Sequence, residues 1–343
     1  MATISLCMIV KNEEKILARC LDSLEGIYDE AIIVDTGSSD KTKEIALEYT
    51  DKVYDFEWID DFSAARNFAM SKATCDYIYM ADADEVLDEA NRVRFMLMKK
   101  ALFDDIEIVQ MKYVNQLSHS TVYNFDNEYR AKLFKRVRNF TFVDPIHEIV
   151  RTDPIVYDSE IEIIHMPESL HSSRDIKTFE KAIKKDGVLS QRLIPMYAKE
   201  LLLCGTMEDF ENALEYFEGV YINSDGVTED NLKVVYIMLA KIYMERMDAK
   251  GLMTFALKEM IGESSSEICH ILGQFYEKSG DYSEAAMWYY NACYETKPYL
   301  AVKYDKILPL EGLIRVSNKL ENASDEAYFK EELEKILLAK ESE

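Results

Sequence analysis

The chain has 343 residues, of which 48% are hydrophobic and 30% charged, and its formal net charge is −24. This length suits two domains of ordinary size, and apolar residues throughout the chain argue against long disordered stretches. The acidic balance offers no basic stripe for phosphates, which argues against nucleic acid and anionic membrane surfaces as partners. It leaves room for a divalent cation that would reconcile clustered carboxylates with an anionic substrate.

The six cysteines are scattered along the chain, and no Cys-x-x-Cys pair occurs among them. This distribution argues against a disulfide framework or a zinc site and fits a reducing compartment. The sequence starts with an apolar run rather than a basic leader, and no stretch is apolar for long enough to span a bilayer. We therefore expect a cytoplasmic protein without a transmembrane segment.

Short apolar runs alternate with helical patterns in the first part of the chain. The spacing predicts strands at 4–10, 29–35, 53–56 and 77–81 and helices at 13–24, 41–49 and 62–73. This order indicates an α/β fold with a mostly parallel, Rossmann-like sheet and right-handed crossovers. Ligands bind beyond the carboxyl ends of such strands, so the loops after Val10, Asp35 and Met80 should share one rim.

From about Asp175 onward the pattern becomes helical and repetitive. The clearest unit runs from Glu267 to Pro298, with small and aromatic residues at the offsets of a TPR helix pair. A weaker copy places Ala240 33 residues before Gly273, close to the TPR period of about 34 residues. We expect stacked helix pairs whose small residues allow close approach, with an irregular helical bundle as the alternative.

Three carboxylates follow the strand at 77–81 directly, in the segment Asp82-Ala83-Asp84-Glu85. Carboxylates packed at the mouth of an apolar strand repel one another, and a bound cation would relieve that repulsion. Alternation along an extended chain puts Asp82 and Asp84 on the same side, where both can reach one ion or one ligand. The alternative is a helix N-cap, in which Asp84 or Asp88 only opens the following helix.

Four motifs in chain order resemble family-2 glycosyltransferases of the GT-A fold. They are CMIVKNEE at 7–14, IIVDTGSSDKT at 32–42, ARN at 65–67 and DADE at 82–85. The helical tail further resembles TPR-bearing members, among them bacterial peptide S-glycosyltransferases and enzymes that modify lipopolysaccharide core or flagellin. The resemblance implies a GT-A glycosyltransferase domain at 1–172 and an all-α, TPR-like helical domain at 173–343.

The resemblance implies a nucleotide-sugar site on the shared rim, with UDP as the expected nucleotide. Asp35 would bind the base and Arg66 the base or the diphosphate, while Asp82 would face the ribose. The full set expected around the nucleotide sugar is Val10, Lys11, Asn12, Glu13, Asp35, Arg66, Asp82 and Ala83. Structural alternatives stay open, with 11–14 as a helix cap, Asp35 as a strand end and Arg66 as a surface charge.

The resemblance also implies a divalent ion, Mn²⁺ or Mg²⁺, held by Asp84, Asp82 and His165. Such an ion bridges the diphosphate and stabilises the departing nucleotide as charge builds on it. His165 follows the apolar run 161–164, where a lone histidine is equally well explained as a structural residue. His171 is a weaker option for the same role.

The segment FVDPIHE at 142–148 resembles part of the TPR-bearing relatives. An inverting transfer needs a base beside the acceptor nucleophile, on the face opposite the leaving nucleotide. Glu148 is the candidate base, with Asp144 and His147 as rivals, because the chain lacks the acidic pair in which usual family-2 enzymes carry an Asp. The basic island at 130–136 is expected either to bind a substrate phosphate or to form the solvated side of a strand.

The leading hypothesis is an inverting, metal-dependent transfer of a sugar from a UDP-sugar to a peptide, protein or glycan acceptor. One alternative is a sugar-nucleotide-forming nucleotidyltransferase, which typically has a Gly-rich loop after the first strand, whereas the loop at 11–14 contains no glycine. Another is a non-catalytic adaptor whose TPR-like array binds a partner. The helical tail is expected to handle the acceptor, to pair two copies of the chain, or to do both.

Overall fold

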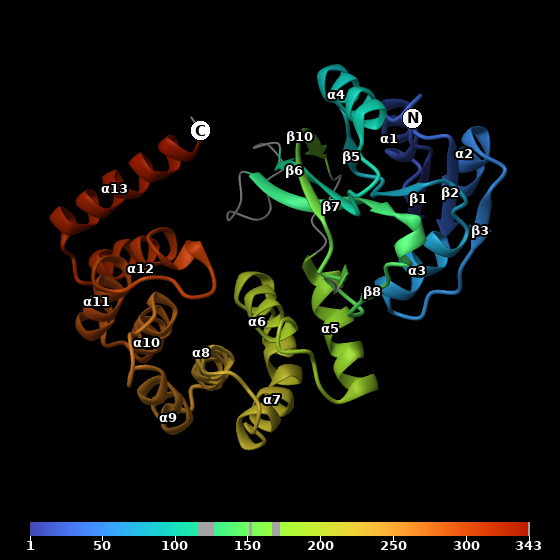
Figure 1. Cartoon of the computed structure of the whole chain (residues 1–343). Coiled ribbons are helices and arrows are strands. Elements are labelled where there is room, and N and C mark those ends of the chain that lie inside the picture. Colours follow the sequence, from blue (N-terminus) through green and yellow to red (C-terminus); the bar gives the residue numbers. More distant parts are fainter. Residues whose placement is uncertain (116–126, 151–152, 167–171, 342–343) are drawn as a thin grey trace. The chain divides into compact units, whose positions relative to one another are not determined.

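The computed structural model describes residues 1–115, 127–150, 153–166 and 172–341. The chain divides into two compact units, Met1–Leu170 and His171–Glu343 (Figure 1). None of the described helices is both long and apolar enough to cross a membrane. His171, the weaker alternative to His165, lies outside the described residues.

A mixed β-sheet forms the centre of the N-terminal unit. Its strands are β1 Ile4–Val10, β2 Glu30–Asp35, β3 Val53–Asp55, β4 Tyr77–Ala81, β5 Glu85–Val86, β6 Ile108–Asn115, β7 Asn127–Lys135 and β10 Val156–His165. Within the described residues, these eight strands lie in the order β3-β2-β1-β4-β7-β6-β10-β5. Strands β1 to β4 pair in parallel, whereas β7 is antiparallel to both β4 and β6. The predicted α/β fold is confirmed, and the carboxyl ends of β1, β2 and β4 lie at the same end of the sheet.

Helices cover both faces of this sheet. They are α1 Leu17–Ser23, α2 Thr42–Tyr49, α3 Phe62–Ser71 and α4 Glu89–Ala101, and the short strands β8 Phe142–Val143 and β9 Ile149–Val150 pair outside the main sheet. Helices α1, α2 and α4 contribute to the core cluster on one face, while α3 and β8 contribute to the cluster on the other. Two covered faces explain why the central strands read as continuous apolar runs in the sequence.

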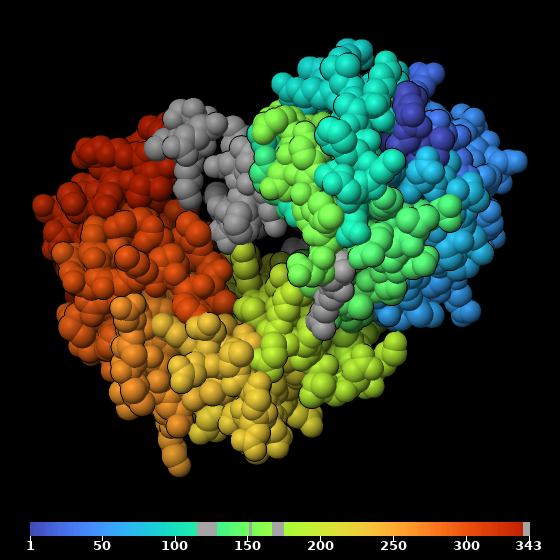
Figure 2. Space-filling view, viewed as in Figure 1, coloured from blue at the N-terminus to red at the C-terminus, as the bar shows by residue number. Residues whose placement is uncertain are grey.

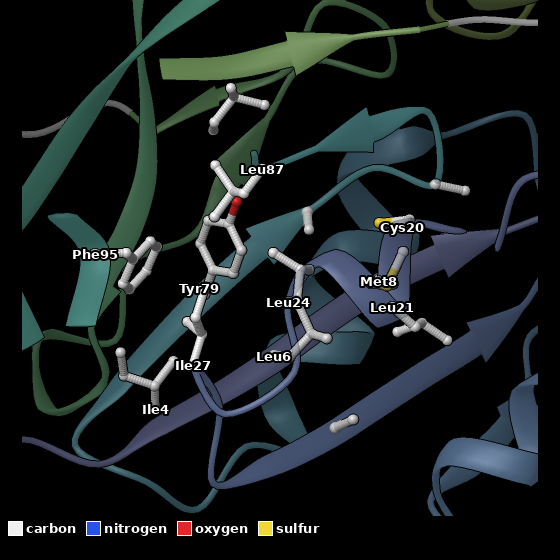
Figure 3. Close-up of a cluster of buried hydrophobic side chains, with 14 of the residues drawn as sticks. Ile4, Leu6, Met8, Cys20, Leu21, Leu24, Ile27, Tyr79, Leu87 and Phe95 are labelled. Carbon is white, nitrogen blue, oxygen red and sulfur yellow. The ribbon is translucent and has the colours of Figure 1, made fainter. Parts of the chain in front are cut away.

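The core follows from the alternation of side chains along β1. Leu6 and Met8 point into the cluster that α1 covers, and Cys7 points into the opposite cluster. Figure 3 shows the first of these clusters, where Leu21 of α1 is drawn beside Leu6 and Met8 of β1. Full burial of one such side chain stabilises the fold by roughly 1.5–3 kcal/mol. The sheet is therefore a rigid base for the loops at its carboxyl end.

Helix α1 begins at Leu17 rather than at Glu13, where the sequence pattern predicts its start. The backbone N–H groups of Glu13 and Glu14 donate instead to Thr42 Oγ1 at 2.7 Å and to Asp40 Oδ2 at 3.2 Å. These bonds tie residues 11–14 to the loop before α2. Periodicity does not reveal such a contact, because the two loops are separated in the sequence and meet only in the fold.

The C-terminal unit consists of helices. They are α5 Ser172–Asp186, α6 Leu193–Cys204, α7 Met207–Ile222, α8 Glu229–Glu245, α9 Ala249–Glu259, α10 Ser266–Ser279, α11 Tyr282–Tyr290, α12 Ile307–Lys319 and α13 Ala323–Glu341. Helix α8 packs against α7, α9 and α10, and α12 packs against α10, α11 and α13. Figure 2 shows the residues of this unit following one another across the surface in sequence order, from yellow-green to red. The predicted helical tail is confirmed.

Small residues let the helices of this unit approach closely around Tyr289. The segment predicted as a helix pair folds as α10 and α11, and the Tyr289 side chain of α11 is fully buried. A Cβ atom added to Gly273 of α10 would lie 2.6 Å from Tyr289 Cδ1, and one added to Gly312 of α12 would lie 2.7 Å from it. Glycine at both positions is therefore required by the packing of a single aromatic ring.

Candidate functional site

The loops that follow β1 and β2 are bonded to each other at the carboxyl end of the sheet. The backbone N–H of Thr36 donates to the carbonyl of Val10 at 3.0 Å. Asn12, whose φ of 57° is left-handed, donates its N–H to Ser38 Oγ at 2.9 Å and accepts the N–H of Ser39 on Oδ1 at 2.8 Å. The two loops, 11–16 and 36–41, therefore form one rigid surface, which we call the ledge. Asn12 helps to hold the two loops together.

Residues 11–14 lie between β1 and the N-cap of α1. The N-cap of α1 is Ile16, which makes no side-chain capping bond. Lys11 is exposed on the ledge, and Glu13 is partly buried there. The carbonyl of Glu13 accepts the N–H of Leu17, the first residue of α1, at 2.9 Å, so the segment leads into the helix as well as bonding to the neighbouring loop.

Asp35 ends β2 with a buried carboxylate that is only half satisfied. Its side chain is 4% exposed, and Oδ1 accepts the backbone N–H groups of Gly37 and Ser38, both at 2.9 Å. The φ of +99° at Gly37 allows this tight turn. Within the described part of the chain, Oδ2 is buried without a hydrogen-bond partner. A buried acceptor left unpaired costs about 1–3 kcal/mol, so Oδ2 is poised to accept a hydrogen bond from a ligand.

Two buried cations neutralise two of the three acids after β4. Arg66 Nη2 donates to Asp82 Oδ1 at 2.8 Å, and Lys132 Nζ lies 3.4 Å from Asp82 Oδ2. Lys132 also forms a buried ion pair with Glu85. Although burial disfavours the charge on Asp82, Arg66 and Lys132 outweigh it and hold the pKa of that carboxyl well below its usual range. For Glu85, burial outweighs the contact with Lys132 and raises the pKa to about 7.

The third acid, Asp84, faces a histidine instead. Strand β5 pairs antiparallel with the end of β10, with His165 opposite Glu85 in the register. This pairing brings His165 Nε2 to 3.0 Å from Asp84 Oδ2. Asp88, not Asp84, caps α4, because its Oδ1 accepts the N–H of Asn91 at 2.8 Å. The helix-cap explanation for Asp84 is therefore wrong.

The three predicted metal ligands are not gathered around one point. Asp84 and His165 are in contact, whereas the Asp82 carboxylate is engaged by Arg66 and Lys132. Across the described ranges, no group of three or more His, Cys, Asp or Glu side chains is arranged to hold a metal ion. The chain by itself therefore offers one carboxylate oxygen and one imidazole nitrogen at this place.

The segment 142–148 is fastened to α3 by a reciprocal pair of hydrogen bonds. Asn67 accepts the N–H of Phe142 on Oδ1 at 2.8 Å and donates its Nδ2 to the carbonyl of Phe142 at 2.9 Å. The carbonyl of Pro145 accepts the N–H of Phe62 at 2.9 Å. The last residue of the ARN motif, Asn67, therefore holds β8 in place, and β8 directly precedes the candidate bases.

Of the three candidate bases, Glu148 forms an ion pair with Arg66. Its carboxylate bonds to Nε of Arg66, and the two side chains are 12% and 13% exposed. Asp144 and His147 have positive φ values of 74° and 50°, an uncommon backbone conformation for residues other than glycine. Arg66 is thus no surface charge: burial disfavours its charge, but Asp82 and Glu148 outweigh this and raise its pKa.

Lys132 and Tyr113 complete the site, and neither was expected there from the sequence. Lys132 belongs to the basic island at 130–136, which was expected to be solvated or phosphate-binding, yet this lysine is buried. The Tyr113 ring lies 5.1 Å from the His165 ring, and the Arg130 guanidinium lies 3.8 Å from the Tyr113 centroid. Strand β7 reads NEYRAKLFK and carries several other charged residues, so the sequence held no signal that set this one lysine apart as buried.

Part of the chain is similar to known proteins. Residues 5–155 match the family model of Glycosyl transferase family 2. The chain is 38% identical over 152 residues to a TPR repeat-containing protein of Synechococcus elongatus, a match that covers 44% of this chain and 36% of that protein. It is 33% identical over 117 residues to the SPbeta prophage-derived glycosyltransferase SunS of Bacillus subtilis, covering 33% of this chain and 28% of the relative. The chain thus spans about a third of the length of these curated relatives.

A solved structure of glucosyl-3-phosphoglycerate synthase from Mycobacterium tuberculosis, in complex with Mn²⁺, UDP-glucose and phosphoglyceric acid, is also similar. It aligns with 55% of this chain and 81% of its own, at 13% identity and a TM-score of 0.40. This similarity is too low to carry any property of that enzyme over to this chain. The family match and the relatives lead to one conclusion: residues 5–155, which make up most of the N-terminal unit, are similar to glycosyltransferases of family 2.

Proposed function

We propose that this chain transfers a sugar, with inversion, from a UDP-sugar to a peptide, protein or glycan acceptor. The observation that carries the proposal is the buried, unpaired Oδ2 of Asp35 at the carboxyl end of β2. The N–H of a uracil ring is a donor that would satisfy this acceptor without displacing the bonds to Gly37 and Ser38. A nucleotide base therefore has a matching partner on the ledge.

The diphosphate of the donor would lie between the ledge and the end of β4. Lys11 is exposed on the ledge and offers an ammonium group, while Asn12 and the backbone of Val10 hold the ledge in shape. Arg66 offers a guanidinium, which suits phosphate oxygens geometrically. Glu13, Asp82 and Ala83 line the same site in this proposal.

Asp84 and His165 would hold the divalent ion. Their side chains already face each other at 3.0 Å, and a carboxylate oxygen suits both Mn²⁺ and Mg²⁺. Two protein ligands leave coordination positions for diphosphate oxygens and water, which is how nucleotide-bound ions are commonly held. When bound, such an ion supplies Lewis-acid stabilisation of the leaving diphosphate. Asp82 stays with Arg66 and Lys132 and keeps both cations in place.

Glu148 would act as the base, with Asp144 and His147 as the alternatives. The acceptor heteroatom forms a bond to the anomeric carbon while the bond from that carbon to the β-phosphate oxygen breaks. The proton of the acceptor passes to the base, and the nucleoside diphosphate leaves with the electron pair. The protein contributes position and charge stabilisation, since no covalent intermediate is needed for inversion.

A binding experiment tests this function. Thermal shifts of the full chain are measured with UDP and a panel of UDP-sugars, with and without MnCl₂, because a ligand of the folded state raises its melting temperature. We expect a Mn²⁺-dependent shift that Asp84→Ala removes. Asp105→Ala changes an exposed acid in the loop before β6 and should leave the shift intact. Absence of both UDP binding and donor hydrolysis in the unaltered chain would refute the proposal and favour an adaptor.

A further inference from the structure

One guanidinium joins the donor side of the candidate site to the candidate base. Arg66 projects from α3, donating Nη2 to Asp82 at 2.8 Å and Nε to the carboxylate of Glu148. Both ends of the Arg66–Glu148 pair are largely shielded from solvent, at 13% and 12% exposed. A shielded charge-assisted bond is strong, so Glu148 is firmly held in this state.

The segment that carries Glu148 does not depend on Arg66 for its position. Its beginning is clipped to Asn67 by two hydrogen bonds, and the carbonyl of Pro145 is bonded to Phe62. The strand β9, which starts immediately after Glu148, pairs with β8. The ion pair can therefore open by rotation of side chains, with the backbone of the segment remaining in place.

The Glu148 oxygen that accepts the N–H of Arg66 Nε is engaged by that bond and is not free to accept a proton from an acceptor molecule. If Glu148 is the base, it becomes effective only when Arg66 turns away from it. A nucleoside diphosphate is a natural competitor, since guanidinium groups bind phosphate oxygens through two parallel bonds. The donor and Glu148 then compete for the same cation.

We propose that Arg66 is a donor-sensitive latch, which holds Glu148 in the empty enzyme and releases it when a nucleoside diphosphate draws the guanidinium away. The inference rests on the proposed function. It makes the base available only after the donor is seated, so that the donor binds before the acceptor can react. Arg66 contacts the donor in this scheme and also controls the base, and Asp82 keeps it within reach of both partners.

Thermodynamic linkage predicts in which direction the UDP affinity changes when the Arg66–Glu148 pair is weakened. If UDP binding breaks the Arg66–Glu148 pair, then weakening that pair must tighten UDP binding by the same free energy. Glu148→Gln removes the charge, and Glu148→Asp keeps the charge while drawing the carboxylate back by one methylene. We expect both variants to bind UDP, in the presence of MnCl₂, about fivefold or more tightly than the unaltered chain in isothermal titration calorimetry.

Glu107→Gln is the matched control. Glu107 also forms an ion pair with an arginine, Arg138, at 2.7 Å, but it lies before β6, near the start of β4 and away from the ledge. Its UDP affinity should equal that of the unaltered chain. Thermal melts of each variant check that it is folded, and Glu148→Ala replaces any variant that is not.

The outcomes separate the latch from the function on which it rests. Weaker or unchanged UDP binding in Glu148→Asp would overturn the latch, even if Glu148→Gln binds more tightly, because the tightening would then come from removal of a negative charge alone. Failure of the unaltered chain to bind UDP at all would overturn the proposed function and the latch together. Tightening in both Glu148 variants, with Glu107→Gln unchanged, is the result that the latch requires.

Discussion

The carboxylate of Asp84 lies 3.0 Å from Nε2 of His165, although 81 positions separate the two residues in the chain. The short strand β5 begins immediately after Asp84 and pairs with the last residues of β10, which puts His165 beside it. A further hydrogen bond, from the N–H of Met166 to the carbonyl of Asp84 at 2.8 Å, extends this pairing. The contact is therefore fixed by backbone pairing as well as by the side chains.

Replacing His165 by phenylalanine should weaken metal binding and leave the fold intact. The phenyl ring preserves the packing on Tyr113, whose ring lies 5.1 Å from that of His165, while the nitrogen that faces Asp84 is lost. We expect the Mn²⁺ affinity of the UDP-bound protein to fall by at least about tenfold. Calorimetric titration of Mn²⁺ at saturating UDP measures this.

Tyr113→Phe serves as the control for that substitution, because it keeps the aromatic ring beside His165 and both predicted ligands. Its Mn²⁺ affinity should stay near that of the unaltered chain. Unchanged metal affinity in His165→Phe would make His165 a structural partner of Asp84 rather than a ligand.

Gly273→Ala should destabilise the helical unit. The added Cβ would lie 2.6 Å from Cδ1 of the buried Tyr289 ring, which cannot move away because Gly312 packs just as closely against it. Overpacking of this kind costs about 1–3 kcal/mol. Urea unfolding followed by circular dichroism measures the change.

Gly219→Ala is the matched comparison, since Gly219 lies in α7 with no atom within 4 Å of an added Cβ. Alanine there should stabilise the protein by roughly 0.5–1 kcal/mol, because it lowers the backbone entropy of the unfolded chain. Equal effects of the two substitutions would contradict the packing argument.

His270 should make stability fall on acidification. Its ring is buried between Tyr289 and Tyr304, at 5.1 and 5.2 Å between centroids. Burial, and then the cations Lys241 and Arg315, hold the pKa of His270 well below 6.5. The folded chain therefore keeps His270 neutral where the unfolded chain takes up a proton. The buried neutral His270 therefore costs no unfolding free energy above pH 6.5, and the free energy of unfolding decreases progressively as the pH falls below that value.

The size of this effect is at most about 1.4 kcal/mol per pH unit for one proton. His270→Phe keeps an aromatic ring between the two tyrosines and removes the titrating group. The slope of unfolding free energy against pH between about 6.5 and 5 should therefore be shallower in this variant by up to that amount. Identical slopes in the two proteins would show that His270 is protonated in the folded state.

The sequence by itself determined the elements around the site. The apolar run at 4–10 and the run at 77–81 became β1 and β4 with the bounds that the pattern predicts, and the helix predicted from Phe62 begins there. These elements could be predicted because they depend on the hydrophobic pattern of neighbouring residues in the chain. The resemblance in four ordered motifs agrees with the match of residues 5–155 to Glycosyl transferase family 2.

Only the tertiary structure decided which charges face each other. Asp82 was predicted to share one ion with Asp84, but its carboxylate contacts Lys132, which lies 50 positions away in the chain and also pairs with Glu85. Arg66 reaches Glu148 across 82 positions. Charge pairing depends on strand order and register, and a register shift of one residue would turn Lys132 to the other face of β7. The residue types therefore predicted a charged site, whereas the antiparallel pairing of β7 with β4 determined which charged side chains form ion pairs there.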